Sequence, residues 1–81
     1  MSEVYRVLVC SDPGHEQLVA EIHIGDQFVA LLSQENGPEQ TLIELVATEV
    51  GDPIKLNLRT FEMAVAEAKK RLWELRRVPR A

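Results

Sequence analysis

The sequence predicts an α+β fold, in which an antiparallel β-meander of three to four strands carries one C-terminal α-helix on one face. Two observations lead to this prediction: β-patterned runs separated by turn residues, and a final segment with apolar residues at helical spacing. An antiparallel sheet with one apolar face needs a second layer, and only the final helix is available for it. With 81 residues, we expect a single domain spanning residues 1–81.

The first half of the chain predicts three strands, at about residues 3–10, 17–24 and 27–34. Gly25-Asp26 separates the last two and is typical of a hairpin, with either a two-residue II′ turn or a longer bulged loop. A two-residue loop would place Ile22 opposite Val29 and Ala20 opposite Leu31, on one apolar face. A slip of one residue would exchange the two faces of the sheet.

A fourth strand is expected at about residues 41–48, after the breaker ENGPEQ, with Ile43 and Leu45 on one face and Glu44 on the other. Residues 54–56 could add a short edge strand. The final helix is expected at about residues 58–77, with Asn57 or Thr60 as its N-cap. Its predicted core residues follow spacings of three and four: Leu58, Phe61, Val65, Ala68, Leu72 and Leu75.

The one cysteine and the two histidines lie close together in the sequence, at Cys10, His15 and His23. Their spacing matches no common zinc site, and a structural zinc site needs four ligands. A nucleophilic thiol would need a nearby base and a lowered pKa, and no strong cation adjoins Cys10. No phosphate-binding glycine loop or other catalytic motif occurs. We therefore predict no enzyme activity, no cofactor and no metal site.

Charge is unevenly distributed along the chain, which carries a net charge of −4. Residues 1–60 carry −7 and residues 61–81 carry +3. Arg76, Arg77 and Arg80 could contact nucleic acid or the acids of a protein partner, but cations at a helix C-terminus also complement its dipole. The acidic body makes nucleic acid an unlikely partner. Without a signal peptide, a membrane span or a cysteine pair, we expect a cytoplasmic protein with no membrane partner.

Two surfaces are candidate interfaces with another protein. On the helix, Met63, Ala66, Trp73 and Arg77 lie away from the core stripe, and Trp and Arg are enriched in binding hot spots. Trp73 could instead lie flat over the sheet edge. On the sheet, the residues expected on the uncovered face are Val19, Phe28, Ala30 and Leu32. An exposed apolar face of that kind suits either a homodimer or a different partner.

The chain also resembles the small bacterial immunity proteins of polymorphic-toxin systems, over about residues 18–72. The resemblance lies in the stretch LVAEIHIGDQFVALLSQENGP and in LNLRTFEMAVAEAKKRL. The chain also bears some likeness to antitoxin domains built from a β-meander and a helix. The resemblance implies a protein that neutralises a cognate toxin by direct binding and has no catalytic residues to carry over. A homodimer of unassigned role is the alternative.

Overall fold

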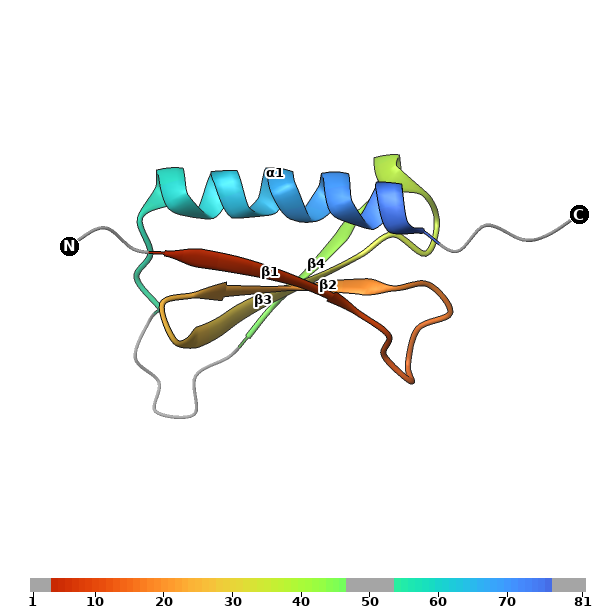
Figure 1. Cartoon of the computed structure of the whole chain (residues 1–81), viewed down its shortest axis with the longest axis horizontal. Coiled ribbons are helices and arrows are strands. Elements are labelled where there is room, and N and C mark those ends of the chain that lie inside the picture. Colours follow the sequence, from red (N-terminus) through yellow and green to blue (C-terminus); the bar gives the residue numbers. More distant parts are fainter. Residues whose placement is uncertain (1–3, 47–53, 77–81) are drawn as a thin grey trace, which may run out of the picture.

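The computed structural model describes residues 4–46 and 54–76 and has a four-stranded antiparallel sheet with one helix packed on it (Figure 1). The strands lie in chain order, β1-β2-β3-β4, so each is hydrogen-bonded to its neighbour in sequence. The α+β meander predicted from the sequence is therefore confirmed. The elements are β1 (Tyr5–Cys10), β2 (Val19–Ile24), β3 (Gln27–Ser33), the 3-10 helix η1 (Pro38–Gln40), β4 (Leu42–Leu45) and α1 (Leu58–Leu75).

The fourth strand and the segment before the helix differ from the prediction. β4 has four residues, and the expected extension at residues 47–48 lies outside the described residues, as do residue 3 and residue 77. The short strand predicted at residues 54–56 is not formed, although Ile54 and Leu56 still pack against the core. The breaker before β4 forms η1, whose N-cap Gly37 has a φ of 98°, a conformation that glycine adopts without strain.

The β2–β3 hairpin has a two-residue loop, one of the two forms that the sequence left open, but the register expected for such a loop is wrong beyond it. Ile24 pairs with Gln27, and Gly25 alone has a positive φ of 62°, as a II′ turn requires at its first position. A β-bulge then shifts the register between Ile22 and His23, so Ile22 lies opposite Ala30 rather than Val29. A bulge adds one residue to one strand, which is why a simple alternation from the turn fails.

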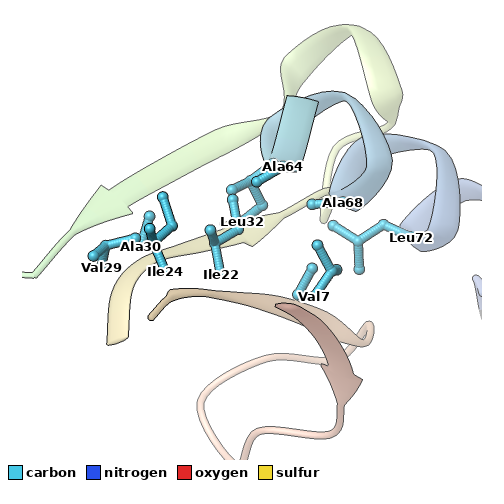
Figure 2. Close-up of a cluster of buried hydrophobic side chains, with 10 residues drawn as sticks. Val7, Ile22, Ile24, Val29, Ala30, Leu32, Ala64, Ala68 and Leu72 are labelled. Carbon is cyan, nitrogen blue, oxygen red and sulfur yellow. The ribbon is translucent and has the colours of Figure 1, made fainter. Parts of the chain in front are cut away.

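The core lies between α1 and one face of the sheet (Figure 2). The helix contributes Ala64, Ala68 and Leu72, all nearly or fully buried, while Phe61 and Val65 are partly buried beside them. Small alanine side chains let the helix backbone lie close to the strands. Leu58 and Leu75, predicted to belong to the core stripe, are 69% and 50% exposed because they lie at the two ends of the helix.

The helix lies over β1 and β2 and has less contact with β3. Two contacts fix it to β1: the Tyr5 hydroxyl donates to Glu67 Oε1 at 3.1 Å, and Arg71 Nη1 donates to the Val7 carbonyl at 2.6 Å. Glu67 also lies 3.8 Å from Arg71, the i,i+4 arrangement typical of helix ion pairs. This off-centre position leaves the β4 side of the sheet less covered.

Candidate protein-binding surface

One flank of α1 faces away from β1 and is largely open. Glu67 and Arg71 reach β1, so at about 100° per residue the opposite flank of the helix faces the β3–β4 side. An open depression of about 540 Å³ follows this flank and is lined by Leu58, Phe61, Glu62, Val65, Ala66 and Lys69. We define the α1 flank as Leu58, Glu62, Val65, Ala66, Lys69 and Trp73.

Trp73 continues this flank toward the end of the helix. Its side chain is 44% exposed, and the Arg76 guanidinium carbon lies 3.6 Å from its ring centroid, a cation–π contact. Arg76 Nη1 also donates to the Trp73 carbonyl at 2.6 Å, so the guanidinium is hydrogen-bonded to a carbonyl at the C-terminal end of α1. In this position the positive charge of Arg76 complements the helix dipole, one of the two roles that the sequence suggested for the basic end of the chain.

Trp73 and Arg76 also line a second, smaller cavity of about 160 Å³. Leu18, Gln34 and Leu72 are among the residues that line it. Gln34 is 8% exposed, and its amide nitrogen donates to Thr41 Oγ1 at 3.2 Å and to the Lys69 carbonyl at 3.4 Å. Trp73 thus both covers this cavity and presents nearly half of its surface to solvent.

The other helix residues predicted as an interface are also exposed where the structure describes them. Met63 is 52% exposed and Ala66 is exposed, whereas Arg77 lies outside the described residues. At about 100° per residue, Met63 lies between Glu67 and Ala66 around the helix, outside the α1 flank. Their contact with a partner stays a prediction.

The prediction of an uncovered apolar face on the sheet is wrong for three of its four residues, which are buried. Val19 and Ala30 are fully buried and Leu32 is 1% exposed, because the bulge places Ala30 and Leu32 opposite Ile22 and Ala20 in the core. Phe28 is 36% exposed and remains available at the surface.

The face of the sheet opposite the helix is instead mixed in polarity. His23 Nε2 lies 3.0 Å from Glu21 Oε1, and the His23 ring stacks on Phe28 with centroids 5.1 Å apart. Glu21 also accepts from the Cys10 thiol at 3.6 Å. On this face, the polar pairs therefore lie among exposed apolar side chains such as Leu8 and Phe28.

The Cys10 environment does not favour a nucleophile. Burial raises the pKa of the thiol above its ordinary value, and the nearby Glu21 carboxylate raises it further. A thiol needs a lowered pKa to be largely ionised at neutral pH. Across residues 4–46 and 54–76, no group of three or more His, Cys, Asp or Glu side chains is placed to hold a metal ion.

β4 forms an apolar surface that the sequence analysis did not single out. Leu42, Ile43 and Leu45 are 61%, 44% and 71% exposed. In a meander the last strand is an edge, and its helix-facing side is covered only if the helix extends across it. Because α1 lies over β1 and β2, the helix-facing side of β4 is exposed. No sequence pattern indicates that position of the helix.

Comparison with known proteins adds no family: no family model, curated protein or solved structure matches this chain. In the described part of the chain, the one α-helix is too polar to span a bilayer. The arrangement itself, an exposed helix flank beside an exposed edge strand, is therefore the basis for a functional proposal.

Proposed function

We propose that this chain is a non-enzymatic protein-binding module that presents the α1 flank and Met63 to its partner. The observation that carries the proposal is the exposure of three large apolar side chains on one helix. Leu58, Met63 and Trp73 are 69%, 52% and 44% exposed, and Leu58 lines the open depression. Large exposed apolar residues grouped on one surface are typical of interaction sites.

The chemistry of the surface suits a protein partner. Trp73 is a rigid, partly exposed anchor with Arg76 stacked on it, and both residue types are enriched in binding hot spots. Glu62 and Lys69 lie at the border of the depression, where charges of opposite sign can fix the orientation of a partner. The small side chain of Ala66 between them allows another chain to approach the helix closely.

We propose further that the partner is a toxin made by the same cell and neutralised in the cytoplasm. The resemblance of residues 18–72 to immunity proteins supports this role, as do the strongly acidic residues 1–60, which can complement a basic substrate cleft. An inhibitor that acts by covering its target needs a stable scaffold and anchors, and no catalytic group of its own.

The test is co-expression with the toxin encoded next to this chain. We expect rescue of growth and a one-to-one complex by size-exclusion chromatography with light scattering. Trp73→Ala should weaken the complex by about 2 kcal/mol or more, roughly thirtyfold in Kd, as for a hot-spot residue.

Leu8→Ala is the matched control, because Leu8 is 43% exposed and lies on β1, away from the α1 flank. It should leave the affinity unchanged. Absence of both complex and rescue would contradict the immunity role. A complex that Trp73→Ala does not weaken would exclude the α1 flank as its binding surface.

A further inference from the structure

We propose that two copies of this chain associate through β4, which pairs with β4 of the second copy in antiparallel orientation across a two-fold axis through Ile43. The two sheets would then form one continuous eight-stranded sheet. This inference goes beyond the proposed function, since the α1 flank stays open for a different partner.

The two edges of the sheet differ in how they are protected. At the β1 edge, Arg71 reaches from α1 and its Nη1 donates to the Val7 carbonyl at 2.6 Å. At the β4 edge, all four strand residues are exposed and three are large and apolar. Proteins usually protect an edge with a short strand, a charged side chain, Pro, a bulge or a covering element. β4 is short and carries Glu44, but it has neither Lys nor Pro.

The backbone pairing shows which groups of β4 point outward. Val46 N donates to the Val29 carbonyl at 3.0 Å, so Val46 forms a hydrogen-bonded pair with β3. In an antiparallel ladder such pairs alternate, so Glu44 and Leu42 also point to β3, whereas Ile43 and Leu45 direct their N–H and C=O groups to the outer side. Within the described residues, nothing bonds to those groups.

Symmetry then restricts the register. A two-fold axis perpendicular to the sheet keeps both helices on the same side, so residues of the same face must lie opposite each other. An axis through Glu44 would place two carboxylates directly opposite, which is destabilising. An axis through Leu45 would pair Ile43 with residue 47 of the second copy, which lies outside the described residues.

An axis through Ile43 avoids both problems. The two Ile43 residues exchange both backbone hydrogen bonds, and Leu45 pairs with Thr41 of the second copy. Each Glu44 lies opposite Leu42 of the second copy rather than opposite its own equivalent. The outward groups of β4 are therefore self-complementary, which favours a second copy over an unrelated strand.

The first test is register-specific cross-linking in a Cys10→Ser chain. Residues that form a hydrogen-bonded antiparallel pair have Cα atoms about 5.5 Å apart, within the range of a disulfide. Ile43→Cys should therefore give a disulfide-linked dimer on mild oxidation. Glu44→Cys and Leu45→Cys should not, because their equivalents are displaced along the strand.

Leu8→Cys is the matched control for random collision, because Leu8 and Ile43 are 43% and 44% exposed on strands at opposite edges. Equal cross-linking of Leu8→Cys and Ile43→Cys would overturn the proposal. Preferential cross-linking of Glu44→Cys would overturn the register and with it the argument from charge.

The second test is the mass of the unmodified chain by light scattering across a dilution series. We expect a dimer that dissociates on dilution, and a monomer for Ile43→Lys with unchanged thermal unfolding. Leu8→Lys should remain dimeric. A monomer at every concentration, or a dimer weakened by Trp73→Ala and not by Ile43→Lys, would overturn the β4 interface. Neither result bears on toxin binding, which the co-expression experiment measures separately.

Discussion

The Cys10 thiol is the residue whose chemistry is most changed by its surroundings. Burial raises its pKa above the ordinary 9.0, and Glu21 adds to the rise by its charge and its hydrogen bond. We predict that the rate of alkylation of Cys10 has a midpoint above pH 9.0. Glu21→Gln should lower this midpoint, because it removes the negative charge that opposes ionisation of the thiol.

The measurement is the pseudo-first-order rate of iodoacetamide labelling against pH, with His15→Ala as a control that leaves Glu21 in place. A midpoint well below 9.0 would contradict the predicted inert thiol and would revive a nucleophilic role for Cys10.

Asp12 and His15 form a local pair in the turn after β1. His15 Nδ1 lies 2.6 Å from Asp12 Oδ2, and this hydrogen bond raises the pKa of His15 above 6.5 and lowers the pKa of Asp12 below 3.8. The His15 contribution to stability is complete below pH 6.5 and is lost as pH rises through the raised pKa. The Asp12 contribution is complete above pH 3.8 and is lost as pH falls through the lowered pKa.

The pair therefore stabilises the fold most between about pH 3.8 and 6.5. We predict that Asp12→Asn lowers the thermal midpoint more at pH 5 than at pH 9, and that NMR titration shows the pKa of His15 returning toward 6.5. An unchanged His15 titration in Asp12→Asn would show that the pair does not form in solution.

At the scale of single elements, the start of α1 depends on one side chain. Asn57 Oδ1 accepts from the Thr60 backbone N–H at 3.1 Å, which resolves the choice of N-cap that the sequence left open. Asn57→Ala should lower the free energy of unfolding by about 1 kcal/mol, because it leaves that N–H without its partner.

Thr60→Ala is the control for this prediction. It keeps the backbone N–H and removes only a 3.4 Å contact between Thr60 Oγ1 and Asn57, so its effect should be smaller. The measurement is urea unfolding of both variants. An equal or larger loss for Thr60→Ala would show that the cap assignment is wrong.

The β2–β3 hairpin and α1 each differ in one respect from what local sequence patterns predict. Alternation from the Gly25-Asp26 turn predicts the loop but not the bulge after it, because a bulge is stabilised by packing on a neighbouring layer. The predicted outer-face residues Ala30 and Leu32 are buried for that reason. In α1, the repeat of apolar residues predicts the helix. The predicted core stripe does not include Ala64, although this residue is fully buried.

At the scale of the whole molecule, stability depends on one layer of side chains between the sheet and α1. Ile22 is fully buried in the centre of it, paired with Val7 on one side and Ala30 on the other. We predict that Ile22→Ala costs about 2–5 kcal/mol, a large share of the 5–15 kcal/mol typical of a domain. Leu8→Ala, on the exposed side of β1, should cost about 0.5 kcal/mol or less.

Denaturant unfolding of the two variants measures the difference. Similar losses for Ile22→Ala and Leu8→Ala would contradict the arrangement in which Ile22 lies in the core and Leu8 on the exposed side of β1.

The sequence by itself determined the meander, the position of the β2–β3 hairpin, the helix and its cap candidates, because each depends on local backbone preference and on short-range periodicity. It also identified Met63, Ala66 and Trp73 as exposed helix residues. Only the tertiary structure decided the bulge that places Ala30 and Leu32 in the core, and the position of α1 over β1 and β2 that leaves Ile43 and Leu45 at an open edge. The lateral position of a helix on a sheet depends on the fit of small side chains such as Ala64 and Ala68 against the strands, and that fit exists only after the layers have packed.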